Sequence, residues 1–202
     1  MRKINVKDYL KVIKAQVGEN YWLGTYGQKA NQLLWNQKSR QAGIEWWYRN
    51  WANERAKAIS NNKKVFDCSG LAFKYPIWLG PDGRLSYDRN TDWNTRMIWQ
   101  RAVKDNLTRG IGINNMPDEP GMLVMNASLI HVGVYIGNGE VVEARGAPHG
   151  VIKSKLSDYP WHYWCKNPAV DYNTDTIAAL KKEVANLKSI IKEVQAIIKD
   201  VK

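Results

Sequence analysis

Apolar residues in the first half of the chain recur with the spacing of helices. Between residues 5 and 17 they share one side, with lysines on the other. These apolar positions are Val6, Tyr9, Leu10 and Ile13. Residues 30–60 predict a further helix or helices, and "WNTRMIWQRAV" predicts a short one. The run "LAFKYPIWLG" predicts a helix only as far as Pro76, whose ring removes a backbone donor, and "GPDGRLSYDRNTD" predicts a surface loop.

The pattern changes at "MPDEPGMLVM", after which the chain predicts strands. "GMLVMN", "HVGVYIG", "EVVEARG" and "GVIKSK" each predict a strand, and "GNG" between the second and third predicts a hairpin. The sheet is expected to end near "WHYWCKNPAVDY". Helices followed by antiparallel strands predict an α+β domain.

Residues 174–202 show a third pattern, with apolar residues at alternating spacings of three and four. The stripe consists of Ile177, Leu180, Val184, Leu187, Ile191, Val194, Ile198 and Val201. This heptad predicts a coiled-coil helix that joins copies of the chain, and Ile190 and Ile197 widen the stripe toward three or four strands. The alternative is a helix that folds back on the rest of the chain. The expected domains are therefore 1–172, which carries the chemistry, and 173–202, an oligomerisation helix.

Composition sets broader limits. A chain of 202 residues with 44% hydrophobic residues can form one sizeable domain with an appendage. The net charge of +11 attracts polyanions, and the lack of a dense Lys/Arg block disfavours nucleic acid as the partner.

No apolar run is long enough to span a membrane, and the N-terminus lacks the apolar block of a secretory signal, so we expect synthesis in a cytoplasm or prior removal of a signal. Ten Trp and ten Tyr suit a groove for sugars or peptides, or fill the core.

The candidate chemistry centres on "VFDCSG", which contains Cys68, one of two cysteines. Asp67 is placed to cap a helix that begins there, and the unpaired N–H groups of a first helical turn favour a thiolate. Small Ser69 and Gly70 leave the sulfur open to approach. The alternative is a buried structural cysteine, which is the only interpretation for Cys165. The cysteines and the three histidines lie too far apart in sequence for a zinc site, and we expect no metal and no cofactor.

A nucleophilic cysteine needs a base, and His131 is the best placed histidine. It opens a strand in which Val132, Val134 and Ile136 form the apolar face, and His131 lies on the opposite, less apolar face. His149 lies in a turn and His162 in an aromatic stretch. Glu143 lies across the "GNG" turn and reaches the face of His131 only if the loop has an odd length or the strand bulges. We therefore predict an odd loop or a bulge. The alternative for Glu143 is a solvated strand carboxylate or a partner for Arg145.

The runs "FDCSGL", "PGMLV" and "HVGVYIGNGEVVEARG" together resemble the NlpC-type cysteine peptidases of bacterial cell walls, over about residues 18–171. The resemblance implies a papain-like domain, in which a cysteine on a helix packs against a sheet that carries the histidine. It implies Cys68 as nucleophile, His131 as base, and Glu143 as the third member, where histidine is commoner.

The same resemblance extends upstream of the cysteine. "YWLG" is similar to a family motif and makes Tyr21 a candidate for oxyanion or substrate binding, together with the backbone N–H of Cys68 and the neighbours Asp67 and Ser69. Leu23 departs from the aromatic residue usual there. Residues from roughly 30 to 62 are an insertion, expected to reshape one wall of the groove.

The activity implied by the resemblance is hydrolysis of an amide in the peptide stem of peptidoglycan, most commonly the D-γ-glutamyl bond to a diamino acid. The alternatives are an N-acetylmuramoyl-L-alanine amidase, a thiol acyltransferase, and a non-enzymatic phage tail protein with a trimerising stalk. "YGQKA", "DCSGL" and "VEARG" together resemble lysins of phages or prophages in Gram-positive bacteria. That resemblance implies synthesis in the host cytoplasm, action on the wall after release, and binding to anionic wall polymers.

Overall fold

The computed structural model describes the backbone of residues 1–200, but not the side chains of residues 174–179, 193–194 and 196–200. One compact unit spans Met1–Val170, and a second begins at Asp171. Among the described residues, no helix combines the length and the apolar character needed to cross a membrane.

Three of the helices begin at asparagine residues whose side chains cap them. Asn5, Asn31 and Asn94 each accept a hydrogen bond from a backbone N–H of the first turn that follows. The helical elements of the compact unit are α1 (Val6–Lys14), α2 (Gln32–Ser39), α3 (Glu45–Asn50), α4 (Asn53–Ser60), the π-helix η1 (Gly70–Lys74), α5 (Tyr75–Trp78), α6 (Thr95–Lys104) and the short 3-10 turns η2 (Arg89–Thr91), η3 (Ile113–Asn115) and η4 (Leu156–Asp158). The helices expected in residues 5–17, 30–60 and "WNTRMIWQRAV" are confirmed.

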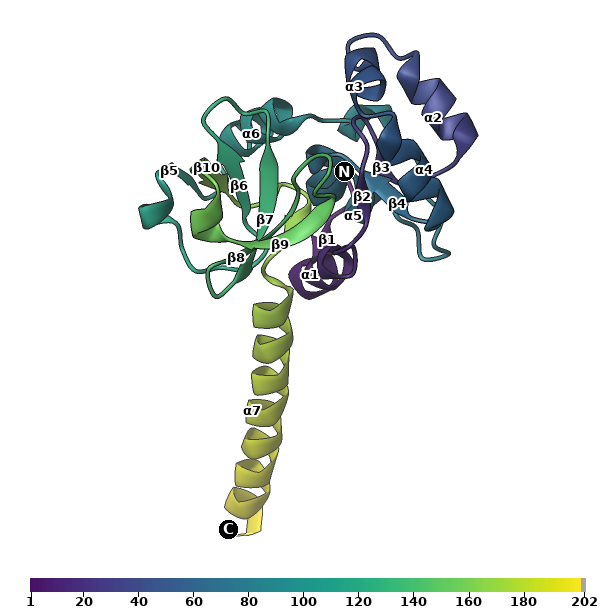
Figure 1. Cartoon of the computed structure of the whole chain (residues 1–202). Coiled ribbons are helices and arrows are strands. Elements are labelled where there is room, and N and C mark those ends of the chain that lie inside the picture. Colours follow the sequence, from purple (N-terminus) through teal and green to yellow (C-terminus); the bar gives the residue numbers. More distant parts are fainter. Residues whose placement is uncertain (201–202) are drawn as a thin grey trace. The chain divides into compact units, whose positions relative to one another are not determined.

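The main sheet is antiparallel and has the order β5-β10-β6-β7-β8-β9. Its strands are β5 (Arg109–Ile111), β6 (Leu123–Asn126), β7 (Val132–Gly137), β8 (Glu140–Ala144), β9 (Val151–Lys155) and β10 (Trp161–Cys165). Figure 1 shows β6, β7, β8 and β9 side by side. The α+β class and the four expected strands are confirmed.

Along the chain the main sheet ends with β10, in the "WHYWC" segment, as expected, although in space β10 lies between β5 and β6. The expectation that the helix stops at Pro76 was wrong, since α5 continues to Trp78. In the widened turn of η1 the N–H of Tyr75 donates to Gly70 O, and Pro76 then occupies the start of α5, where a missing N–H is tolerated.

The smaller sheets bring distant parts of the chain together. β4 (Lys64–Phe66) lies between β2 (Asn20–Tyr21), which is parallel to it, and β3 (Tyr26–Lys29), which is antiparallel. β1 (Ile4–Asn5) and β11 (Val170–Asp171) form a two-stranded sheet. Because β4 ends at Phe66, the β2–β4 pairing places Tyr21 next to the segment that contains Cys68.

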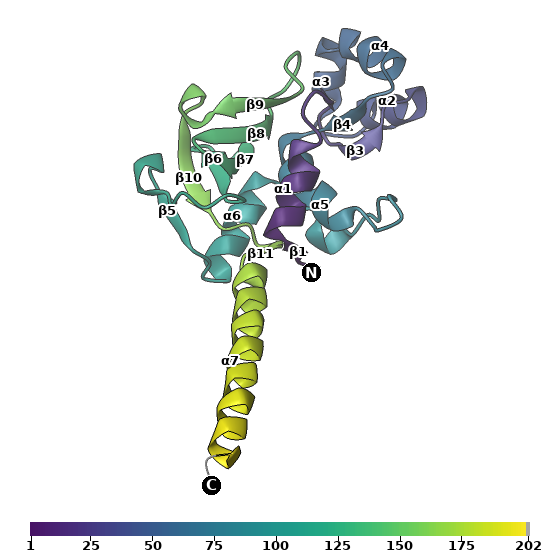
Figure 2. The same cartoon turned by 90° about the horizontal axis from the view of Figure 1, so that it is seen from below.

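The inserted segment is a small helical subdomain with an aromatic core. In both views α2, α3 and α4 gather on one side of the compact unit, beside β3 and β4 (Figures 1 and 2). Trp35, Trp47 and Tyr48 are buried there and pack against Trp22, with most ring pairs in edge-to-face contact. The Tyr48 hydroxyl donates to Leu23 O at 2.7 Å, so this subdomain is fastened to the loop after β2.

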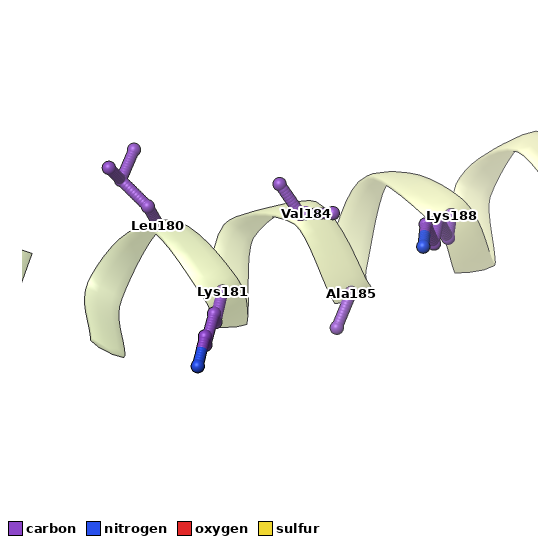
Figure 3. Close-up of a pocket in the computed structure, with 5 residues that line it drawn as sticks. All are labelled: Leu180, Lys181, Val184, Ala185 and Lys188. Carbon is purple, nitrogen blue, oxygen red and sulfur yellow. The ribbon is translucent and has the colours of Figure 1, made fainter. Parts of the chain in front are cut away.

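The second unit is the helix α7 (Thr174–Asp200), which coincides with the predicted heptad. Of the stripe, Leu180, Val184, Leu187 and Ile191 are exposed in the single chain. Figure 3 shows Leu180 and Val184 projecting on one side of the helix, away from Lys181 and Ala185. Val201 lies outside the described residues, as do the side chains of Ile177, Val194, Ile197 and Ile198. The coiled coil therefore stays a prediction.

Candidate active site

Cys68 opens a helical turn that leads into η1. Asp67 caps this turn: its carboxylate accepts hydrogen bonds from Gly70 N at 2.5 Å, Ser69 Oγ at 3.0 Å and Gly24 N at 3.0 Å. Gly70 has to lack a side chain, because a Cβ there would overlap the backbone oxygen of Thr25. The sequence "DCSG" thus fixes the cysteine at a helix N-terminus, as expected, with its sulfur half-exposed.

Three residues surround the sulfur. Cys68 Sγ lies 3.9 Å from Thr95 Oγ1, at the start of α6, and 3.7 Å from Ile130 O, in the turn between β6 and β7. The third is His131, whose pKa the neighbouring Cys68 side chain acts to raise. Helix and sheet therefore meet at this thiol.

The His131 ring connects Cys68 to a buried carboxylate. Its Nε2 lies 2.7 Å from Glu143 Oε2. Burial acts to lower the pKa of His131, but the interactions with Cys68 and Glu143 outweigh it and raise the pKa to about 9. The structure thus brings Cys68, His131 and Glu143 together, and its groups favour a protonated imidazole.

Glu143 is fully buried, and its second oxygen is also engaged. Oε1 accepts from Ser154 Oγ of the neighbouring strand at 2.6 Å and lies 3.6 Å from Arg145 Nε. Burial acts to raise the pKa of Glu143, but hydrogen bonds from His131 and Ser154 and the charges of His131 and Arg145 hold it below its usual value. This carboxylate is therefore ionised inside the sheet, and its contact with Arg145 accompanies the contact with His131.

A bulge puts Glu143 on the face of His131. Gly137 pairs with Glu140 across the Asn138–Gly139 turn, and the register shifts between Tyr135 and Gly137. The two-residue loop alone would have sent Glu143 to the opposite face. The prediction of an odd loop or a bulge is confirmed by this bulge.

Two aromatic rings hold the imidazole, and the sequence interpretation missed both. Trp161 of β10 stacks on His131 with ring centroids 5.3 Å apart and an angle of 16°, and Tyr159 lies 4.9 Å away. Gly133 makes room for Trp161, because a Cβ there would approach both Trp161 and Val141 too closely. A glycine inside an alternating strand signals such a close approach, and Gly133 was the available signal.

Asn126 sets the position of the turn between β6 and β7. Its Oδ1 accepts from the backbone N–H groups of Ile130 and His131 at 3.0 and 3.1 Å. The same turn presents Ile130 O to the sulfur. The side chain of Asn126 therefore controls the approach of the histidine to the cysteine from the sheet side.

A groove of about 640 Å³ opens over Cys68. Tyr21 and Leu23 line it on one side and Leu129 and Ile130 on another, together with Asn94, Thr95 and Arg96 at the start of α6. Gly43 and Ile44 of the inserted segment also line it, so the insertion does shape one wall. The Tyr21 ring packs against Trp47 at 5.7 Å, and its burial and the neighbouring Cys68, Asp67 and Tyr48 raise its pKa well above the usual value, so the hydroxyl stays protonated.

The remaining candidates lie elsewhere. Cys165 is fully buried in β10, and burial raises the pKa of its thiol to about 12, against the opposing charge of Arg109. His149 is exposed in the loop between β8 and β9, and His162 lies on β10. Among the described residues, no group of three His, Cys, Asp or Glu side chains could hold a metal ion.

No protein-family model matches this chain, and no curated protein matches it in sequence. Several solved structures are similar. NlpC2 from Trichomonas vaginalis is 15% identical over 82% of this chain and 49% of its own, with a TM-score of 0.41. The peptidoglycan hydrolase RipB from Mycobacterium tuberculosis is 20% identical over 83% of this chain and 65% of its own, with a TM-score of 0.45. The NlpC/p60 domain of the peptidoglycan hydrolase SagA is 14% identical over 81% and 99%, with a TM-score of 0.44.

This chain spans about half the length of the Trichomonas vaginalis protein.

Proposed function

We propose that this protein is a thiol-dependent hydrolase that cleaves an amide bond in the peptide stem of peptidoglycan. The observation that carries the proposal is that the His131 Nε2 lies 2.7 Å from the buried Glu143, while the carbonyl of the preceding residue, Ile130, contacts the sulfur of Cys68, which lines a groove. A thiol, an imidazole and an orienting carboxylate in this order are the requirements of nucleophilic acyl transfer.

In the first half of the proposed reaction the Cys68 thiol gives its proton to His131. Since Nε2 is engaged by Glu143, Nδ1 is the ring nitrogen that exchanges this proton. The sulfur attacks the amide carbonyl, and the tetrahedral intermediate collapses with loss of the amine, which takes the proton from His131. A thioester to Cys68 remains.

In the second half water attacks the thioester while His131 takes a proton from it. The acid product leaves, and the proton returns to the Cys68 sulfur. Glu143 holds the ring and stabilises its cation throughout, which agrees with the raised pKa of His131. The backbone N–H of Cys68 is proposed to bind the oxyanion, and the protonated Tyr21 hydroxyl on the groove wall to assist.

The bond proposed is the D-γ-glutamyl bond to a diamino acid, as the sequence resemblance implies, in a phage or prophage lysin. The net charge of +11 supports binding to the anionic polymers of a Gram-positive wall, which surround that substrate. An N-acetylmuramoyl-L-alanine amidase or a thiol acyltransferase would use the same three residues. The difference lies in the products, because an acyltransferase passes the acyl group to an amine instead of water.

The test is turbidity loss of purified Gram-positive sacculi, followed by mass spectrometry of the released fragments. We expect lysis by the native protein and by Cys165→Ser, and none by Cys68→Ala. Equal lysis by Cys68→Ala and the native protein would remove the thiol from the mechanism. New amine and carboxyl ends at the glutamyl bond support the bond proposed, whereas ends at the lactyl–alanine amide identify the amidase.

We also propose that α7 associates with α7 of other copies of the chain. Leu180, Val184, Leu187, Ile190 and Ile191 are between 46% and 54% exposed in the single chain, and an isolated helix with such a stripe gains stability by burying it. Several catalytic units on one stalk would engage the polymer at several points at once. The mass in solution with and without residues 174–202 tests this: a monomer in both cases contradicts it.

A further inference from the structure

A second, polar pocket of about 380 Å³ lies beside the groove. Leu23 lines the groove and its neighbour Gly24 lines the second pocket. The position that a Cβ of Gly24 would take is 2.7 Å from Ile44 Cδ1, on the groove wall, and 3.8 Å from Lys38 Nζ, in the second pocket. A ligand that crosses Gly24 therefore passes from one pocket to the other.

Most charged groups of this pocket are already paired. Lys74, in the helical segment that follows Cys68, is almost completely buried and pairs with Asp92 at 2.7 Å between Nζ and Oδ1. The other Asp92 oxygen accepts from the Tyr87 hydroxyl at 3.1 Å. Asp92 is thus satisfied on both oxygens, and it neutralises one of the two lysines.

Lys38 is the cation that remains. It comes from α2 of the inserted segment and is half-buried. Its ammonium donates to the amide oxygen Gln41 Oε1 at 3.0 Å, and none of the described carboxylates lies within ion-pair distance of it. Burial lowers the pKa of Lys38, and the Lys74 ammonium adds to this against the attraction of Asp67 and Asp92. A partly buried ammonium with a single neutral partner is stabilised by an added anion.

We infer that this pocket is a subsite for a carboxylate of the peptide substrate, with Lys38 as the group that binds it. The inference deepens the proposed function and rests on it. The lining itself carries two lysines and one aspartate, and Asp67, the other carboxylate whose charge acts on Lys38, already accepts hydrogen bonds from Gly24, Ser69 and Gly70. The partly buried Tyr26 adds a hydroxyl donor of the kind a carboxylate accepts. The ligand class is therefore an acidic peptide, held with its carboxylate across Gly24 from the scissile amide.

The experiment compares two probes on the full chain. One is the free-acid tripeptide L-alanyl-γ-D-glutamyl-L-lysine, and the other is the same peptide with both carboxylates converted to carboxamides. Binding is measured by titration calorimetry on Cys68→Ala, which cannot turn the peptide over. We expect the free acid to bind about tenfold more tightly than the amide, as for one charge-assisted hydrogen bond.

Three variants on the Cys68→Ala background identify the group responsible. Lys38→Gln removes the charge and is expected to erase the preference, whereas Lys38→Arg is expected to retain it. Lys57→Gln removes an exposed lysine of the same inserted segment, outside the pocket, and controls for the general positive charge of the protein. A preference that survives in Lys38→Gln, or falls equally in Lys57→Gln, overturns the inference, and so does the absence of binding by either probe.

Hydrolysis of the two probes by the protein with Cys68 intact separates this inference from the proposed function. Cleavage of both at equal kcat/KM overturns the subsite and leaves the hydrolase standing. Selective binding of the free acid without cleavage of any amide supports the subsite and contradicts the hydrolase.

Discussion

The two cysteines occupy opposite environments. Cys68 begins a helical turn, lines the groove, is partly exposed and lies beside the His131 imidazole. Cys165 lies in the interior strand β10, fully buried, where desolvation raises the pKa of its thiol to about 12. The same side chain therefore borders a groove and an imidazole in one region and is sealed from solvent in the other.

The two regions differ in the polar atoms that reach the sulfur. Around Cys68, Thr95 Oγ1 and Ile130 O approach the sulfur, and Glu143 sits behind the histidine. Cys165 has the strand residues Leu123 and Arg109 as its cross-strand neighbours. Apolar burial makes a cysteine inert because it disfavours the thiolate. A reactive cysteine needs access to solvent and a neighbouring positive charge that stabilises the thiolate.

The largest expected effect comes from deleting each thiol. Cys68→Ala should lower the rate of sacculus lysis by about four orders of magnitude or more, because no other group can form the thioester. Cys165→Ala should leave the lysis rate nearly unchanged and lower the free energy of unfolding by about 1–2 kcal/mol, since it opens a small cavity. Lysis assays and urea unfolding measure the two effects. If the two variants change the lysis rate and the free energy of unfolding to the same extent, the contrast between the two cysteines is contradicted.

Alkylation should separate the thiols next. Iodoacetamide is expected to modify Cys68 in the native protein and Cys165 at least about a thousandfold more slowly, at the rate set by unfolding. Peptide mass mapping over time follows both sites in one sample. In urea the two rates should converge. Equal modification of both thiols under native conditions would contradict the assigned environments.

Replacing the carboxylate behind the histidine tests what makes the first region reactive. Glu143→Gln keeps the size of the side chain but removes its charge, and we expect kcat/KM for sacculus lysis to fall by about a hundredfold. Ser154→Ala removes one hydrogen bond to the same carboxylate, and kcat/KM for sacculus lysis should fall by much less in this variant. The rate of Cys68 alkylation should fall in parallel with lysis. Unchanged rates in Glu143→Gln would mean that another group orients the imidazole.

The pH dependence of stability should differ between native protein and a variant without the imidazole. The folded pKa of His131, about 9, lies above its unfolded value of about 6.5. Protonation of His131 therefore stabilises the fold fully below about pH 6.5, and this contribution is lost as the pH rises through about 9. Urea unfolding of native protein and His131→Gln between pH 6 and 9 measures it. The stability difference should shrink with rising pH, and a growing difference would contradict the assignment.

The smallest effect is expected at Thr95. Its hydroxyl lies 3.9 Å from the sulfur, a weak contact, so Thr95→Val should change kcat/KM by less than about tenfold. Sacculus lysis rates measure this effect. A larger loss would show that the hydroxyl belongs to the group that makes Cys68 reactive.

Sequence patterns predicted the parts of the fold that repeat. The helical spacing found α1 and α6, and the alternating runs found β6 to β9. Parity across the "GNG" turn predicted an odd loop or a bulge, and a bulge is what aligns Glu143 with His131. These features depend on residues close together in the chain, and each obeys a period or a turn rule.

The features that escaped prediction depend on contacts between distant segments. β5 is the three-residue run Arg109–Ile111, too short to show a period, and it exists because β10 pairs with it. The ion pair of Lys74 with Asp92 links η1 to a loop, and the stacking of Trp161 on His131 links β10 to the start of β7. No local pattern specifies which distant residue fills such a position.

The ring that stacks on the imidazole has a consequence for the order of synthesis. Trp161 belongs to β10, which also bridges β5 and β6, so the chain must be translated past Cys165 before the sheet closes and His131 gains its support. A nascent chain still on the ribosome with only the cysteine and histidine exposed has both groups but no fixed distance between them. The proposed catalytic pair thus gains its stacked support only after the last strand of the sheet has emerged.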